Sequence, residues 1–229
     1  MRSSVATLDI AGWRLQSFGD GNARKVVDPI IEPHWEGDRV LVRVSLGGSP
    51  EVDLTDEHGT PVDDEAGLGP EIVKATLASS LVLDGYLTFQ ATRPSEGLAV
   101  DGPHAPSTAD MTTQLFLGAG AQRRRQELAD SREHALAAGP LAFVAVDLLA
   151  VDDDPILDAP LLERKRILEG VLLESALVRR TAFVRPPVDA WLGTWRGIGF
   201  RTLAYKAANG RYLPGAKNPG WAKVNIPQR

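Results

Sequence analysis

The sequence predicts an α+β fold with two mainly antiparallel β-sheets flanked by helices. Strand-like and helix-like segments follow one another irregularly, without the strict strand–helix alternation of a parallel sheet. The length of 229 residues allows one substantial core, and the 43% hydrophobic and 24% charged residues are ordinary for a globular protein. We therefore expect one domain over residues 1–229, with an N-terminal extension at residues 1–25.

The first two predicted strands form a hairpin. Arg39–Leu46 alternates apolar and polar residues, which is typical of a strand with one buried face. Gly47 and Gly48 then supply positions that tolerate a positive φ angle, and Glu51–Thr55 resumes the extended pattern. The pattern therefore predicts two antiparallel neighbours.

A buried central strand and a helix are predicted in the second half of the chain. Leu141–Ala150 is almost wholly apolar, and Asp147 is the polar residue within it. Asp158 is the expected N-cap of the following helix, with Pro160 and Glu163 in its first turn. The apolar stripe of this helix consists of Leu161, Leu168 and Leu172.

The other elements follow from the same periodicities and from clusters of proline and glycine. Trp191 and Trp195 lie four residues apart on one of the predicted helices, so we expect them in the core. The predicted elements are a helix over Glu71–Ser80, a strand over Leu81–Gln90, a mobile loop over residues 93–112, a helix over Ala121–Ala138 with Arg123–Arg125 on a solvated face, a strand over Ala176–Val184, a short helix over Val188–Trp195, and strands over Phe200–Lys206 and Ala222–Ile226.

Composition excludes several classes of protein and site. There is no cysteine, so disulfides, thiolate metal sites and cysteine nucleophiles are excluded. The longest apolar run, Leu141–Val151, is about half the ~20 residues that a membrane helix requires. Asp9, Arg14 and Asp20 fall where a signal peptide needs an unbroken apolar stretch. We therefore expect a cytoplasmic protein that has no membrane partner.

Charge is divided unevenly along the chain. The formal net charge is −5, but residues 190–229 hold seven basic residues and no acidic ones, which leaves −12 for residues 1–189. Glu51–Glu71 holds eight carboxylates and no lysine or arginine. A cationic segment facing a nucleotide or DNA is one interpretation of residues 190–229, and a solvated basic face is the other.

Generic catalytic motifs are absent from the sequence. It contains no P-loop and no dinucleotide-binding glycine motif after a strand. The histidines His34, His58, His104 and His134 lack the paired spacing of metal ligands, so no metal site is predicted.

Seven short pieces, read in order, carry a resemblance that no single piece would support. They are Ile31–Arg39 (IEPHWEGDR), Val82–Leu87 (VLDGYL), Phe143–Leu149 (FVAVDLL), Pro160–Lys165 (PLLERK), Leu203–Lys206 (LAYK), Tyr212–Gly215 (YLPG) and Trp221–Asn225 (WAKVN). Their order and spacing resemble the adenylation domain of ATP-dependent DNA ligases, in the covalent nucleotidyltransferase superfamily that includes mRNA capping enzymes. The resemblance runs from Val26 to Ile226. It implies the ligase and capping-enzyme nucleotidyltransferase fold, which is ATP-grasp-like, and a link to DNA repair. It also implies that the chain is the adenylation domain alone, without the C-terminal oligonucleotide-binding-fold domain that usually follows in ligases.

The first motif departs from the family at the reacting residue. In the family, a lysine in Glu-x-Lys-x-Asp-Gly-x-Arg attacks the α-phosphate of ATP and carries AMP as a phosphoramidate. Here His34 stands at the lysine position and Glu36 at the aspartate position, whereas Glu32, Gly37 and Arg39 match.

Five further positions depart from the family's motifs. At two of them the family has a carboxylate and this chain does not, so expected Mg²⁺ ligands are missing. At a third, the family has an arginine and this chain has an acid. Each change should cost several kcal/mol of transition-state stabilisation. The degenerate positions are Glu57 (for arginine), Tyr86 (for glutamate), Val146 (for the aromatic residue that stacks on adenine), Arg201 (for glutamate) and Asn225 (for the second lysine of Trp-x-Lys-x-Lys).

These departures predict a pseudoenzyme, a ligase-like domain that cannot form covalent lysyl-AMP but retains nucleotide or DNA-backbone binding. The residues predicted to bind a nucleotide or phosphate are Glu32, Arg39, Lys206 and Lys223, with ATP and Mg²⁺ as cofactors only if family activity survives. One alternative is an active ligase or nucleotidyltransferase in which His34 is the nucleophile. Another is a structural protein that binds a protein partner. For Asp84 and Asp147, we expect buried structural carboxylates.

Overall fold

The computed structural model describes residues 12–64, 66–90 and 140–227. The predicted loop over residues 93–112, the predicted helix over Ala121–Ala138 and residues 1–11 of the predicted extension lie outside the described residues. No helix of the described part is long and apolar enough to cross a bilayer.

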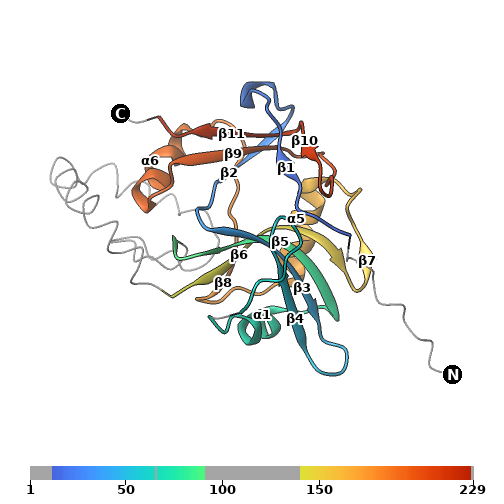
Figure 1. The fold of residues 1–229 in the computed structure, drawn as a ribbon. Helices are drawn as coiled ribbons and strands as arrows, with labels where there is room; N and C mark the ends of the chain where they lie inside the picture. Colours follow the sequence, from blue (N-terminus) through green and yellow to red (C-terminus); the bar gives the residue numbers. More distant parts are fainter. Residues whose placement is uncertain (1–11, 65, 91–139, 228–229) are drawn as a thin grey trace.

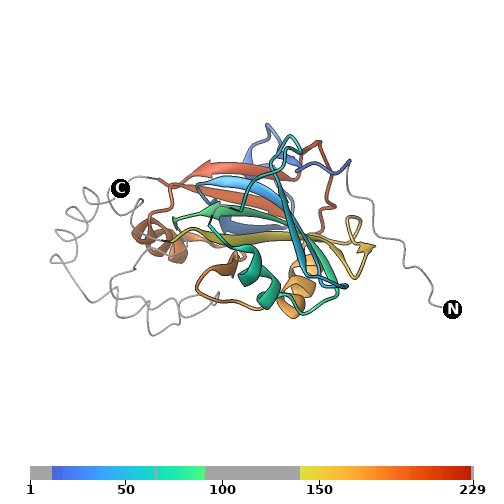
Figure 2. The same cartoon turned by 60° about the horizontal axis from the view of Figure 1, so that its bottom comes forward.

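Two sheets lie face to face in the described fold (Figures 1 and 2). The larger sheet has six strands in the order β4-β3-β5-β6-β7, with β8 also paired to β6, and the smaller has the order β11-β9-β2. A short parallel ladder joins β1 to β10. The strands are β1 (Ser17–Phe18), β2 (Pro29–Pro33), β3 (Asp38–Ser45), β4 (Glu51–Thr55), β5 (Ser80–Thr88), β6 (Ala142–Val151), β7 (Asp154–Pro155), β8 (Val178–Arg180), β9 (Thr202–Ala207), β10 (Lys217–Asn218) and β11 (Trp221–Asn225).

The predicted α+β class with mainly antiparallel sheets is confirmed. Within the described residues, every neighbouring strand pair of the two larger sheets is antiparallel except β6 with β8. The hairpin is present as β3 and β4, and β6 is the predicted buried strand, paired to β5 on one side and to β7 and β8 on the other. The strands predicted over Leu81–Gln90, Phe200–Lys206 and Ala222–Ile226 are β5, β9 and β11.

The main core lies on the face of the larger sheet that is turned away from the smaller sheet. Side chains alternate along β3, so that Val40, Val42 and Val44 face this core while Leu41 faces the smaller sheet. The helix α1 (Gly69–Ala75) and the second half of α5 (Leu161–Val171) cover the core face (Figure 2). The smaller sheet is covered on its outer face by α6 (Asp189–Ile198).

The predicted stripe of α5 and the tryptophan pair of α6 are core positions. Leu161, Leu168 and Leu172 are buried as expected. Trp195 is 4% exposed, and its ring lies 6.1 Å from that of Trp191. The core interpretation is therefore confirmed for Trp195, whereas Trp191 is partly buried against the same cluster.

Two predicted elements are markedly shorter in the structure. The helix predicted over Glu71–Ser80 ends at Ala75, because Thr76 turns extended and its hydroxyl donates to the Ile72 carbonyl oxygen at 2.8 Å. The strand predicted over Ala176–Val184 is shortened to β8, and Val184 instead pairs with β2 of the other sheet.

Asp158 does not cap α5, contrary to the prediction. Pro160 is the N-cap residue, with no side-chain capping bond, and Asp158 lies 3.3 Å from the guanidinium of Arg211 on the surface. Strand β2 was not predicted, because prolines at both of its ends obscure the short apolar pattern of Ile30 and Ile31.

Gly85 is expected to be one of the least replaceable residues of the fold. It lies at a register shift between β5 and β6, and a Cβ atom there would collide with the ring of Phe143 and approach the Val144 carbonyl oxygen to 2.6 Å. Gly85→Ala should therefore destabilise the fold by about 1–3 kcal/mol or more through overpacking. Urea unfolding followed by tryptophan fluorescence measures the loss.

Gly47→Ala is the matched control, since nothing lies within 4 Å of a Cβ at Gly47. If Gly85→Ala unfolded at the same urea concentration as this control, the close packing at Gly85 would be wrong.

Candidate functional site

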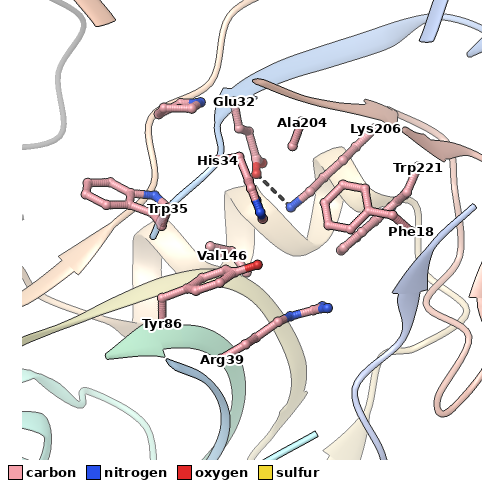
Figure 3. A pocket seen from close by; sticks show the side chains of 11 residues that line it. Phe18, Glu32, His34, Trp35, Arg39, Tyr86, Val146, Ala204, Lys206 and Trp221 are labelled. Atoms are coloured by element: carbon pink, nitrogen blue, oxygen red, sulfur yellow. Dashed lines mark ion pairs between the residues drawn. The ribbon is translucent and has the colours of Figure 1, made fainter. Parts of the chain in front are cut away.

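A small cleft lies between the two sheets (Figure 3). The space left between its side chains is close to the minimum for one bound water. The cleft is thus nearly filled by the protein's own side chains. Its lining residues are Phe18, Glu32, Pro33, His34, Trp35, Arg39, Tyr86, Val146, Ala204, Lys206 and Trp221.

Strand register explains why charged side chains of the smaller sheet face this cleft. Glu32 of β2 pairs with Ala204 of β9, which pairs with Lys223 of β11, so these three side chains share one face. Lys206 and Trp221 form the adjacent pair on the same face. The sequence pieces from three distant segments are thereby brought to one site.

Glu32 is shared by two buried lysines. Its carboxylate oxygens lie 2.6 Å from Lys165 Nζ and 2.7 Å from Lys206 Nζ, and all three side chains are at most 4% exposed. Lys206 Nζ also lies 4.1 Å from the centroid of the Trp221 ring, a cation–π contact. Burial lowers the pKa of Lys165, and the neighbouring carboxylate of Glu32 partly offsets this lowering. Glu32 therefore neutralises one of two positive charges.

Arg39 is held by Asp84 of the larger sheet. Its Nε and Nη2 donate to the two carboxylate oxygens at 2.9 and 2.6 Å, and Nη1 donates to the Gln16 carbonyl oxygen at 2.6 Å. The Tyr212 hydroxyl donates to the same carboxylate at 3.0 Å. Burial opposes the charged form, but Asp84 raises the pKa of Arg39 above its usual range. The expectation that Asp84 is a buried structural carboxylate is thus confirmed.

Asp147 forms a second buried pair, with Arg164 of α5. The carboxylate accepts from Arg164 Nε at 2.9 Å and from Nη2 at 2.8 Å, and both side chains are fully buried. Arg164 also donates to the carbonyl oxygens of Ala159 and Gly210. Asp147 is therefore a structural carboxylate, as expected.

His34 lies in an aromatic and cationic environment. Its ring packs edge-on against Phe18 and Tyr86, with ring centroids 5.5 and 5.7 Å away. Burial, followed by the charges of Lys223, Lys206 and Arg39, lowers the pKa of His34 to about 3. The imidazole is therefore uncharged at neutral pH.

Lys223 lies at the side of the cleft. Its Nζ is 4.5 Å from the centroid of the Phe18 ring. Burial and the charge of Arg39 lower the pKa of Lys223, while Glu57 acts in the opposite direction. Among the ion pairs that the described residues form, none involves Lys223.

Comparisons with known proteins identify the fold. No protein-family model matches the chain. DNA ligase B of Mycobacterium tuberculosis is 30% identical over an alignment of 168 residues, and the match covers 71% of this chain and 29% of that ligase. A probable DNA ligase of Streptomyces coelicolor is 28% identical over 202 residues, covering 85% of this chain and 34% of that protein.

Solved structures agree with these relatives. The ligase domain of M. tuberculosis LigD has a TM-score of 0.60 at 19% identity, and the match covers 95% of this chain and 60% of that chain. A mycobacterial DNA ligase D complexed with ATP and MES has a TM-score of 0.59 at 19% identity, and the match covers 94% of this chain and 60% of that chain. The chain has the fold of a DNA ligase adenylation domain. It is a distant homologue of DNA ligases and spans less than a third of the length of the M. tuberculosis relative.

The five positions predicted to be degenerate occupy different places in this fold. Tyr86 and Val146 line the cleft, and Glu57 lies in the exposed turn after β4, 3.7 Å from His58. Asn225 shares the cleft-side face of β11 with Lys223 but accepts from the Thr202 hydroxyl at 3.3 Å. Arg201 is exposed just before β9. Neither Asn225 nor Arg201 lines the cleft.

The basic C-terminal segment of the ligase fold is partly neutralised within the chain. Lys206 pairs with Glu32, Arg211 lies 3.3 Å from Asp158, and Lys217 lies 2.7 Å from Asp20. All three acidic partners belong to residues 1–189, which carry the net negative charge. The uneven charge of the sequence is therefore offset in part by contacts between its two regions.

Sequence reasoning missed several residues of the site. Lys165 and Trp221 fell inside the pieces that carried the resemblance but were assigned no role. Phe18 belongs to a short segment without periodicity or motif, so no signal pointed to it.

His34 should remain uncharged well into the acidic range. In the folded chain the pKa of His34 is about 3, below the ordinary value of 6.5. Between pH 6.5 and pH 3, His34 is therefore protonated in the unfolded chain but not in the folded chain. His34 therefore lowers the free energy of unfolding as pH falls from 6.5 towards 3, and His34→Gln should remove that part of the acid sensitivity. NMR titration of the histidine rings measures the pKa, with His58→Gln on the exposed surface as control. A His34 midpoint near 6.5 would contradict the described surroundings.

Proposed function

We propose that the chain is a ligase-type adenylation domain that has lost covalent adenylyl transfer and retains a cationic cleft for an anionic ligand. The observation that carries the proposal is the position of His34. It follows β2 in the motif where the family has its nucleophilic lysine, and it faces Lys206, Lys223 and Arg39. No amine stands at that position.

The carboxylates of the cleft support the loss of activity. Glu32 is engaged by two lysines, and Asp84 is engaged by Arg39 and Tyr212. Among the described residues, no group of three or more histidines and acids could hold a metal ion. The described residues therefore do not fit the Mg²⁺ ion that the ligase fold implies.

Net charge supports an anionic ligand. Arg39 and Lys206 line the cleft and Lys165 and Lys223 lie beside it, while the nearby carboxylates are those of Glu32, Asp84 and Glu57. Because His34 is uncharged, a positive balance remains in a poorly hydrated site, where it attracts anions more strongly than on the surface. A nucleotide or a DNA backbone phosphate has this chemistry, and backbone binding should weaken steeply with added salt.

A second candidate function is a nucleotidyltransferase with His34 as nucleophile. The uncharged imidazole among three cations favours it, since an unprotonated ring nitrogen can attack a phosphate that neighbouring cations hold.

Intact-mass spectrometry separates the two candidates. The wild type and His34→Ala are incubated with Mg²⁺ or Mn²⁺ and each nucleoside triphosphate, beside an active ATP-dependent DNA ligase as positive control. We expect no mass increase in either chain. An added nucleotide on the wild type that is absent from His34→Ala would establish the histidine mechanism, and an adduct on both chains would place the reaction on another residue. Either adduct would overturn the proposed loss of activity.

A further inference from the structure

We infer that the cleft holds one halide ion such as chloride, bound beside Lys206 as the counter-charge of the buried lysine pair Lys165 and Lys206. The inference rests on the proposed function, because it names an anion that the cationic cleft accepts. It follows from the charge balance of the buried side chains, the polar groups that surround the cleft and the space between them (Figure 3).

The buried ion pairs of the described residues leave one positive charge unbalanced. Two buried carboxylates each have one guanidinium as partner, in the pairs Asp84–Arg39 and Asp147–Arg164. Glu32, in contrast, is shared by Lys165 and Lys206, and these three side chains are at most 4% exposed. An uncompensated charge in a poorly hydrated interior is costly. A second negative charge beside the two lysines should therefore stabilise the fold.

Hydrogen-bond donors surround the space next to Lys206. Its ammonium group has three N–H donors, and Glu32 is its ion-pair partner. Trp221 is 1% exposed, and its indole Nε1 has no hydrogen-bond partner within the described structure, which is rare for a buried donor. Figure 3 shows the His34 ring and the Tyr86 hydroxyl turned towards the same space as Lys206 Nζ. A halide accepts hydrogen bonds from several donors at once, so this set of groups suits it.

The space in the cleft favours a monatomic anion. The room between the lining side chains is close to the minimum for one water molecule. A chloride ion is only slightly larger than a water molecule, whereas a phosphate group carries four oxygens around its centre and needs the walls to move apart. The cleft as it stands therefore fits a halide, and a single water is the competing occupant.

Thermal unfolding at constant ionic strength tests the halide site. The melting temperature of the wild type is measured while sodium gluconate, whose anion is too large for the cleft, is replaced stepwise by sodium chloride. An ion that binds the folded chain alone stabilises it, so chloride at about ten times its dissociation constant should raise the melting temperature by about 3–6 °C. The rise should saturate as chloride increases, which a general salt effect does not do.

Lys165→Met tests whether the unbalanced charge holds the ion. It removes one charge of the pair and leaves the lining of the cleft, to which Lys165 does not contribute. This variant should lose the chloride-dependent rise. Lys74→Met is the matched control, because it removes a lysine from the exposed pair with Glu71, and it should keep the rise. An equal rise in Lys165→Met, or no rise in the wild type, would overturn the inference.

Crystals grown with bromide locate the ion directly by anomalous scattering. We expect a peak within hydrogen-bond distance of Lys206 Nζ in the wild type and in Lys74→Met, and none there in Lys165→Met. Peaks confined to exposed cations would mean an adventitious ion only and would overturn the inference. A covalent nucleotide on the wild type would instead contradict the proposed function, whatever the halides do, so the two failures are distinguishable.

Discussion

Asp147→Asn should destabilise the fold by about 3–5 kcal/mol, because it leaves the fully buried Arg164 guanidinium without its counter-charge. The substitution preserves the shape of the side chain and removes only the charge. Urea unfolding measures the loss, with Asp154→Asn on the exposed strand β7 as the matched control. The control should stay within about 0.5 kcal/mol of the wild type.

The double variant Asp147→Asn with Arg164→Met isolates the charge from the packing. Removing both partners eliminates the uncompensated charge, so the double variant should be more stable than the sum of the single losses predicts. Additive losses would mean that the two side chains do not interact in the folded chain.

Glu32→Gln should be similarly damaging, at about 3–5 kcal/mol, because one change leaves Lys165 and Lys206 buried without a carboxylate. Burial lowers the pKa of Lys165 in the folded chain, so the folded state binds protons less readily there than the unfolded state. Stability should therefore recover as pH rises towards the ordinary lysine pKa of about 10.4. Urea unfolding between neutral and alkaline pH measures the effect.

Lys165→Met in the Glu32→Gln background is the compensating variant, since it removes one of the two orphaned charges and keeps the aliphatic volume. It should regain part of the lost stability at neutral pH. A Glu32→Gln variant as stable as the wild type would show that the carboxylate is not the counter-charge of the two lysines.

The ion pairs of the fold change how the uneven distribution of charge along the sequence is interpreted. Lys206 and Lys223 were predicted as ligand-binding cations of one basic segment. In the fold, Lys206 is bound to Glu32 and stacked on Trp221, whereas Lys223 is an exposed residue whose Nζ lies against the Phe18 ring. Pairing of this kind depends on the register of β2, β9 and β11, which no local sequence pattern specifies.

Much of the fold could be predicted because periodicity and turn residues are local signals. The alternation in β3 and β4 and the apolar run of β6 gave those strands directly. The ends of the helices and strands were harder to predict from the sequence. The turn at Thr76 and the cap of α5 depend on contacts with distant backbone, such as the bridge between Thr76 and Leu172.

The candidate site was predictable only where a motif marked it. His34, Arg39 and Tyr86 were found through their positions in the ligase-like pieces, and the fold brings them to one cleft. Phe18 lies in a segment that carries no motif, and the pairing of Lys165 with Glu32 depends on how two of the ligase-like pieces pack in three dimensions.

The measurement that tests the central claim most directly is ATP–pyrophosphate exchange. Adenylyl transfer to a protein side chain releases pyrophosphate reversibly, so labelled pyrophosphate enters ATP whenever the covalent intermediate forms, even if it is too short-lived to isolate. With Mg²⁺ or Mn²⁺ present, we predict that the wild type incorporates no more label than a protein-free sample, while an active ligase does so readily. Incorporation by the wild type that His34→Ala abolishes would contradict the loss of adenylyl transfer.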